Sequence, residues 1–172
     1  MGDFTAMPDA PDPESCPERT PAPSWRDTFQ SHMDARIAVA RDLESLDGVP
    51  SDGNASMWVR IRDLECSAAA LAILGDYVPW GIGQALGLHV GGNSLDNTLR
   101  IVHRQTSVDT DDWLLVDVHA YAVAEGFGHG RVHIWARDGR LLATASQSIV
   151  AREWDRPPAA RRVSSADTPP EH

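Results

Sequence analysis

The sequence contains no lysine, few cysteines and no long run of apolar residues. Its 172 residues include 15 basic residues, all of them arginine, against 25 acidic ones, which gives a formal net charge of -10 and a pI of about 5.0. A surface of this sign repels nucleic-acid phosphates and anionic lipid headgroups, so we expect no nucleic-acid partner and no membrane partner. No apolar run approaches the roughly 20 residues of a membrane span.

The two cysteines, Cys16 and Cys66, lie far apart in the chain. They form no disulfide framework, and free thiols are typical of a reducing compartment. The first residues, MGDFTAMPDAPDPES, carry neither the basic start nor the apolar stretch of an export signal. The sequence therefore predicts a cytoplasmic protein.

The prolines separate the ends of the chain from its middle. Ten of the 12 prolines fall in residues 1–23 and 155–172, which are rich in Asp, Glu, Ser and Ala and poor in large apolar residues. This composition predicts two disordered tails. The about 130 residues between them, 24–154, are enough for one compact domain.

Alternation of apolar and polar residues predicts strands along most of this domain. The segments are FQSHMDARIAV (29–39), MWVRIRD (57–63), SLDNTLRIV (94–102), WLLVDVHAYAVA (113–124), GRVHIWA (130–136) and LLATASQSIVA (141–151). The turn RDGR joins the last two of them.

One segment, SAAALAILGDYVP (67–79), predicts a helix that Ser67 caps and Pro79 ends. It is apolar nearly all round, so we expect it to be buried. The next segment, GIGQALG (81–87), follows a helix rather than a strand, so a hinge or a pocket wall is expected there instead of a dinucleotide loop. A central helix followed by antiparallel strands predicts an α+β fold, a single hot-dog domain whose sheet wraps around the helix.

The last predicted strand carries a primary amide on its apolar face. Every second residue from Leu141 to Ala151 is apolar except Gln147. An amide in this place is either a satisfied core group or a group that binds water or a carbonyl, and the pattern alone leaves both open.

Three stretches of the chain resemble the C-terminal hot-dog repeat of the acyl-CoA thioesterase II family, over about residues 57–152. They are LGDYVP, GGNSLDNTLRI and DDWLLVDVHAYAVAEGFGHGRVHIWARDGRLLATASQS. Members of this family hydrolyse fatty acyl-CoA thioesters with a water that an Asp, a Thr or Ser and a Gln hold. The resemblance implies these roles for Asp76, Ser94 and Gln147, with acyl-CoA as the substrate and no cofactor. Asp96 is close enough in sequence to Ser94 to support the site.

The chain departs from the family pattern in two ways. A usual member carries two hot-dog repeats, whereas this chain has length for one, so we expect a second chain to supply the neighbour in a homodimer or higher oligomer. The passage after Asp76, residues 77–93, is also shorter than the family pattern.

Each predicted site residue has an alternative explanation. Asp76 is expected in the last turn of an apolar helix, where the helix dipole and burial both disfavour a carboxylate. A residue kept at such a cost suggests a catalytic role. The alternative is that Asp76 caps the following turn. A triad of Ser94, Asp96 and a histidine lacks the Gly-x-Ser-x-Gly elbow. The histidines near Arg131, which are His119, His129 and His133, more often form a solvated face than a metal site, and we expect no metal.

The functions that compete with hydrolysis are a non-catalytic acyl-CoA binding or sensing module and an enoyl thioester hydratase. The hydratase would need an Asp and a His facing the acyl chain. For a hydrolase, the oxyanion donors expected from the sequence are the backbone amides of residues 81–83 or the amide of Gln147.

Overall fold

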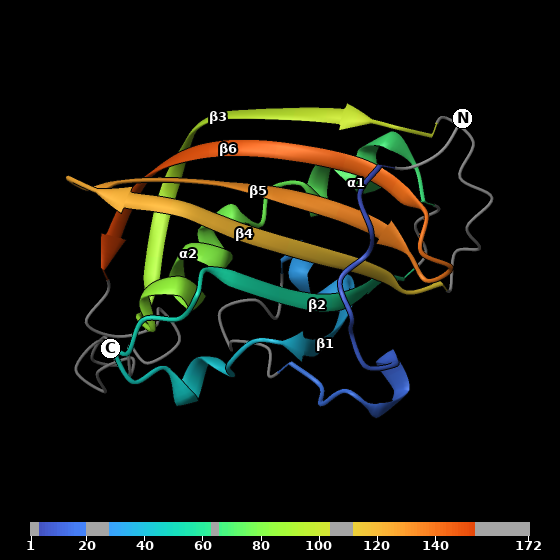
Figure 1. The fold of residues 1–172 in the computed structure, drawn as a ribbon, viewed down its shortest axis with the longest axis horizontal. Coiled ribbons are helices and arrows are strands. Elements are labelled where there is room, and N and C mark those ends of the chain that lie inside the picture. Colours follow the sequence, from blue (N-terminus) through green and yellow to red (C-terminus); the bar gives the residue numbers. More distant parts are fainter. Residues whose placement is uncertain (1–3, 20–27, 63–65, 104–111, 154–172) are drawn as a thin grey trace, which may run out of the picture.

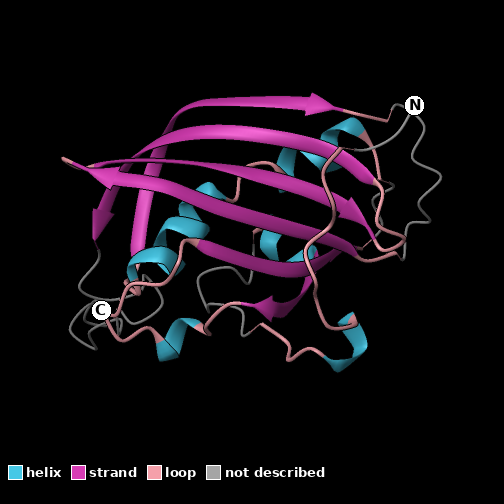
Figure 2. Ribbon diagram, viewed as in Figure 1, coloured by secondary structure: helices cyan, strands magenta, loops and turns pink. Residues whose placement is uncertain are grey.

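The computed structural model describes residues 4–19, 28–62, 66–103 and 112–153. Six strands form one antiparallel sheet in the order β1-β2-β4-β5-β6-β3, and the sheet curves over a helix (Figures 1 and 2). The strands are β1 (Met33–Val39), β2 (Asn54–Ile61), β3 (Val90–Ile101), β4 (Leu114–Ala124), β5 (Phe127–Ala136) and β6 (Leu141–Glu153). This is the predicted hot-dog architecture. Neither helix in the described part of the chain is long and apolar enough to cross a membrane.

All six predicted strands are present, and their inward residues build one core. The alternation in β2 is confirmed, since Met57, Val59 and Ile61 are buried against the helices. The first strand is shorter than predicted, because Phe29–His32 form a 3-10 helix ahead of β1. The turn between β5 and β6 is also confirmed, with Gly139 at φ 88°, a left-handed conformation that glycine adopts without strain.

The helical region differs from the prediction. Two helices replace the single helix expected over residues 67–79, namely α1 (Ala68–Leu74) and α2 (Val78–Leu86). Ser67 caps α1 as predicted, by accepting a hydrogen bond from Ala70 N at 3.3 Å. Pro79 does not end a helix but stands in the first turn of α2, where its fixed φ and missing N–H are tolerated.

The helix that the sheet surrounds is α2, which packs against β2 to β6. Its glycines allow this close packing, because a Cβ atom at Gly81 would lie 2.3 Å from Cγ1 of Val118 in β4. A Cβ atom at Gly128 in β5 would lie 2.3 Å from Cδ1 of Ile82. The segment predicted as a hinge or pocket wall is therefore the buried part of the central helix.

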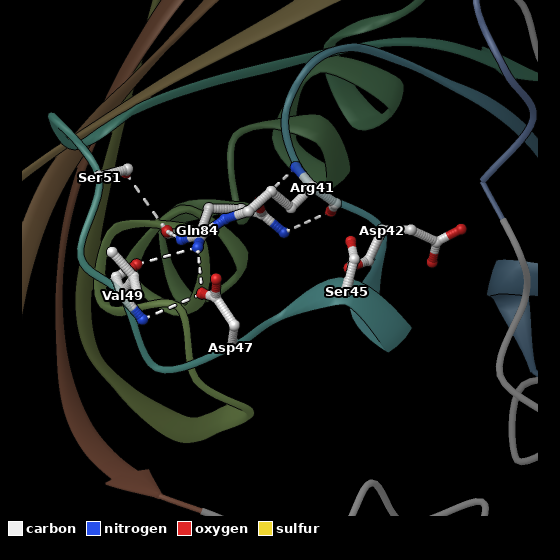
Figure 3. Close-up of polar contacts among 7 residues, drawn as sticks. All are labelled: Arg41, Asp42, Ser45, Asp47, Val49, Ser51 and Gln84. Carbon is white, nitrogen blue, oxygen red and sulfur yellow. Dashed lines mark hydrogen bonds and ion pairs between the residues drawn. The ribbon is translucent and has the colours of Figure 1, made fainter.

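The connection between β1 and β2 is tied to the C-terminal turn of α2 (Figure 3). Gln84, only 3% exposed, accepts a hydrogen bond from Arg41 N at 2.8 Å and donates to Arg41 O at 3.0 Å. The Arg41 guanidinium donates to Gln84 O at 2.7 Å and to Val49 O at 2.9 Å, and it pairs with Asp47 at 2.9 Å. These contacts hold the connection as a fixed cover over the end of the helix.

The N-terminal segment, residues 4–19, is packed against the protein, so the prediction of a disordered tail over residues 1–23 is wrong for this part. The segment runs across the outer face of the sheet in Figure 1 and contributes to a second apolar cluster there. That cluster consists of Cys16, Trp58, Trp113, Leu115, Trp135 and Leu141. The remaining residues of the two predicted tails, 1–3, 20–23 and 155–172, lie outside the described residues.

Backbone hydrogen bonds hold the N-terminal segment in place. Trp58 donates its indole N–H to Pro11 O at 2.8 Å. Ile37 N donates to Pro17 O at 2.9 Å, and Arg19 N donates to Ala35 O at 2.9 Å, so the end of the segment pairs with the outer edge of β1. The segment packs with few large apolar residues of its own, among them Met7, because the sheet supplies the tryptophans that it covers.

Candidate functional site

Asp76 lies in the short connection between the two helices. Gly75 caps the C-terminus of α1, Tyr77 is the N-cap of α2, and Asp76 stands between them, outside both helices. Its side chain is exposed. The prediction of a buried carboxylate in the last turn of a helix is therefore wrong, because the helix ends earlier and a second one begins.

Ser94 and Asn97 reach Asp76 from β3. Residues three apart in a regular strand point to opposite faces, but the pairing of β3 with β6 shifts between Ser94 and Asp96. This bulge brings Ser94 Oγ to 3.3 Å from Asp76 Oδ1 and Asn97 Nδ2 to 3.5 Å from the same oxygen. Asn97 also donates to Gly75 O at 3.4 Å. Asn97 was not among the predicted site residues, and in a regular strand its side chain would lie on the face opposite Ser94.

Gln147 lies directly opposite Asn97 in the pairing of β6 with β3 and is fully buried. Its amide nitrogen donates to Ser94 Oγ at 2.6 Å and to Asp76 Oδ1. Its amide oxygen has no hydrogen-bond partner among the described residues. A buried unpaired acceptor costs about 1–3 kcal/mol, which distinguishes this amide from a core amide that is satisfied on both atoms.

The apolar face predicted around Gln147 points into the central core, except at its first residue, Leu141. Ala143, Ala145 and Ile149 belong to the central core, whereas Leu141 packs in the outer cluster. The cause is a second irregularity, in the pairing of β5 with β6 next to Trp135. It places the side chain of Leu141 on the outer face of the sheet.

The three donors converge on one oxygen of Asp76. Ser94, Asn97 and Gln147 all bond to Oδ1, and the described residues form no hydrogen bond to Oδ2. Asp76 therefore does not cap the turn that follows it, which was the predicted alternative, and α2 begins without a side-chain cap. A carboxylate held by one oxygen, with the other exposed, can accept a proton from a bound water.

The site opens into a cavity of about 650 Å³. Its lining consists of Arg19, Gln30, Ala72, Ile73, Asp76, Tyr77, Pro79, Trp80, Ser94 and Asn97. The residues come from the N-terminal segment, the 3-10 helix ahead of β1, both α-helices with their connection, and β3, so the cavity lies between elements that are far apart in the sequence. A volume in this range fits a small organic group.

Asp96 lies on β3 between Ser94 and Asn97 and bonds the neighbouring strand β6. Its carboxylate accepts a hydrogen bond from Ser148 N at 3.1 Å, next to Gln147 in β6. It makes no described contact with Asp76. Asp96 therefore joins β3 to β6 at the bulge that places Ser94 and Asn97; its supporting role in the site stays a prediction.

The oxyanion donors expected at residues 81–83 are not available in this arrangement. Gly81 N donates to Tyr77 O at 3.1 Å as part of α2. The first N–H groups of a helix have no partner within it, so the free donors belong to the first turn of α2. Tyr77 and Trp80, at the start of that turn, line the cavity.

The histidines of β4 and β5 lie away from Asp76. His119 bonds Asn54 at 2.5 Å, His129 bonds Ser148 at 3.2 Å, and both rings pack near Tyr121. Within the described residues, no three His, Cys, Asp or Glu side chains gather in a way that could hold a metal ion.

We expect Gln147→Ala to lower both stability and activity. The substitution removes the donor to Asp76 and Ser94 and leaves a small cavity, which should cost about 2 kcal/mol or more of stability. Gln147→Met is the matched control, because it keeps most of the side-chain volume without the amide. Melting curves and any activity of the site should be measured for both; a Gln147→Met variant with wild-type activity would contradict a functional role for the amide.

Comparisons with known proteins agree with the fold. A family model described as the acyl-CoA thioesterase C-terminal domain matches residues 8–151. A solved structure from Novosphingobium aromaticivorans, provisionally named a thioesterase, is 32% identical with a TM-score of 0.69 and covers 87% of this chain and 55% of its own. No curated protein sequence matches the chain.

Two further solved structures share the fold at lower identity. A hot-dog protein of unknown function from Alicyclobacillus acidocaldarius is 24% identical with a TM-score of 0.72, covering 88% of this chain and 56% of its own. The acyl-CoA thioesterase II TesB2 from Mycobacterium marinum is 24% identical with a TM-score of 0.64, covering 90% of this chain and 59% of its own. The chain thus spans little more than half the length of these relatives.

Proposed function

Because the chain belongs to the acyl-CoA thioesterase C-terminal domain family, we propose that it hydrolyses acyl-CoA thioesters to a carboxylic acid and a thiol. The observation that carries this proposal is the convergence of Ser94, Asn97 and Gln147 on one oxygen of Asp76 at the wall of a cavity. A fixed carboxylate beside a pocket is suited to activating a water.

In the proposed reaction a water lies between Oδ2 of Asp76 and the carbonyl carbon of the thioester. Asp76 takes one proton as the water oxygen bonds to that carbon, and Ser94 Oγ accepts a hydrogen bond from the other proton. The C–S bond then breaks, and the proton on Asp76 passes to the leaving thiolate. Gln147 was predicted to hold the water itself; here its amide hydrogens go to Asp76 and Ser94, so its proposed role is to fix both.

The thioester oxygen gains negative charge during the attack and needs donors. We assign this role to the N–H groups in the first turn of α2, at Val78 and Trp80, since Pro79 has no N–H. The positive end of the helix dipole lies at the same place. The water activated by the adjacent Asp76 would then attack a carbonyl that α2 already polarises.

The test is steady-state hydrolysis of acyl-CoAs of different chain lengths by the purified protein, with a thiol reagent to report free CoA. Hydrolysis above the uncatalysed rate is the expected result. Binding of acyl-CoA without release of CoA would favour the sensing module instead. The hydratase is disfavoured because the described residues that line the cavity include no histidine.

We also propose that the protein is a symmetric homodimer joined through β3. The outer edge of β1 is already covered by the N-terminal segment, which leaves β3 as the open edge of the sheet. This strand is exposed over most of its length, including Ser94 and the apolar Leu95, which is 57% exposed. A second copy paired along β3 would cover both the edge and the site.

Light scattering at working concentration should report a dimer. Leu95→Glu should shift the protein toward monomer, because it places a charge in the proposed interface. Tyr121→Glu, at an exposed residue of β4, is the matched control and should leave the dimer intact. A wild-type monomer would contradict this proposal. The cytoplasmic location stays a prediction from the sequence.

A further inference from the structure

Asn97 engages only the nitrogen of its side-chain amide. Its Nδ2 donates to Asp76 Oδ1 at 3.5 Å and to Gly75 O at 3.4 Å. No described residue donates to its Oδ1. Asn97 is exposed and lines the cavity. Both amide hydrogens are therefore used at the connection that carries Asp76, and the amide oxygen is left as an acceptor for a group that enters the cavity.

The cavity lining has an apolar side and a polar side. The helices supply the apolar side, which consists of Ala72, Ile73, Pro79 and Trp80. The strand β3 supplies Ser94 and Asn97, which both bond Asp76. The other polar residues of the lining are already linked by hydrogen bonds to Tyr77; they are Arg19 and Gln30. An acyl chain suits the helical side, so the polar pantetheine arm of CoA is expected on the side of β3.

We propose that Asn97 recognises the leaving thiol, because its amide oxygen accepts a hydrogen bond from the cysteamine N–H of CoA. This inference rests on the proposed hydrolase and assigns a leaving-group contact to the same site. In the proposed reaction the sulfur lies near Asp76, since the proton on Asp76 passes to the thiolate. Two methylene groups separate this sulfur from the cysteamine nitrogen. The N–H is then within reach of Asn97, whose own nitrogen bonds the same carboxylate.

One amide thereby connects the leaving group to the base. A hydrogen bond accepted by the oxygen of an amide polarises it and strengthens the bonds that its nitrogen donates. The two bonds from Asn97 are long for N–H···O bonds, and the hydrogen bonds of a catalytic site often tighten when the substrate binds. A thioester that lacks an N–H at this distance from the sulfur should therefore be the poorer substrate. The alternative is that Asn97 only holds the end of α1 through Gly75 O, which predicts no dependence on the thiol.

The experiment compares two hexanoyl thioesters of equal length, one of N-acetylcysteamine and one of 2-acetoxyethanethiol, in which an ester oxygen replaces the N–H. We expect wild type to have the higher kcat/KM for the N–H thioester by roughly 2- to 10-fold, the size expected for one neutral hydrogen bond. Asn97→Ala should bring this ratio close to one and should lower turnover of both thioesters, because Asp76 loses a donor.

Two further variants separate the two ends of the amide. Asn97→Asp keeps an acceptor oxygen without the N–H donor, so it should keep the preference for the N–H thioester while turnover falls. Thr98→Ala is the matched control, because Thr98 is the exposed neighbour of Asn97 on β3 and does not line the cavity. It should keep the ratio and the turnover of wild type. Melting curves of the three variants report whether each is folded.

A wild type that hydrolyses both thioesters equally well would overturn the inference and leave the hydrolase intact. Equal losses on both thioesters in Asn97→Ala, with the ratio of wild type retained, would overturn it too and would indicate the structural role. If neither thioester is hydrolysed, NMR titration with the S-hexyl thioethers of the same two thiols gives the ratio of their Kd values. Tighter binding of the N–H thioether that Asn97→Ala abolishes would support the inference and contradict the hydrolase. Equal Kd values would contradict both.

Discussion

Asp76→Asn should lower turnover by roughly 10² to 10⁴ while leaving the melting temperature nearly unchanged. The variant can keep its amide oxygen at the position of Oδ1, where Ser94, Asn97 and Gln147 donate. The hydrogen bonds and shape of the site are then retained. The group at the position of Oδ2 becomes an amide nitrogen, which cannot take a proton from water. Only the proposed proton acceptor is removed.

The measurement is steady-state hydrolysis by wild type and Asp76→Asn, with melting curves for both proteins. Asp96→Asn is a suitable control, because its carboxylate bonds Ser148 N rather than the site, and asparagine can still accept that bond. An Asp76→Asn enzyme as active as wild type would assign the base to another residue. Loss of folding in Asp76→Asn would instead indicate a structural role.

Deletion of residues 1–16 should destabilise the protein by about 3–6 kcal/mol, since it exposes two or more large side chains that are now buried. The tryptophans of the outer cluster, Trp58 and Trp135, are 2% and 0% exposed beneath this segment. The melting temperature should fall by roughly 10 to 20 °C for a chain of this size. The deletion leaves Arg19 and its bond to β1 in place, so the cavity keeps its lining.

Deletion of residues 155–172 is the control for this experiment. The sequence predicts that segment to be disordered, so its removal should change neither the melting temperature nor the activity. Melting curves of the two deletion variants, measured in parallel, show which of the two segments contributes to stability. If removing residues 1–16 had no effect, the packing of the N-terminal segment would contribute little to stability.

The strands that build the core were predictable because their inner faces are mostly apolar. Met57, Val59 and Ile61 alternate with outward residues and all reach the core, and the same is true of Val132 and Ile134 in β5. Such alternation follows directly from the two faces of a strand. Gln147 stood out against this background because it is a polar exception on an apolar face.

Departures from regular geometry were not predictable from the pattern. The bulge next to Leu95 turns Asn97 into the site, although no residue type marks it. Pro79 can end one helix or begin another, and only the fit of α2 under the sheet decides between them. The N-terminal segment looks disordered from its own composition, and it is ordered by tryptophans that belong to the sheet.

The strand order also sets the sequence of folding events that completes the site. β4, β5 and β6 are consecutive in the chain and pair as neighbours, so this meander can close through short loops. β3 precedes all three but pairs with β6, which requires a much longer loop to close. Ser94 and Asn97 lie on β3 and Gln147 on β6. A nascent chain therefore cannot assemble the candidate site until synthesis has passed β6.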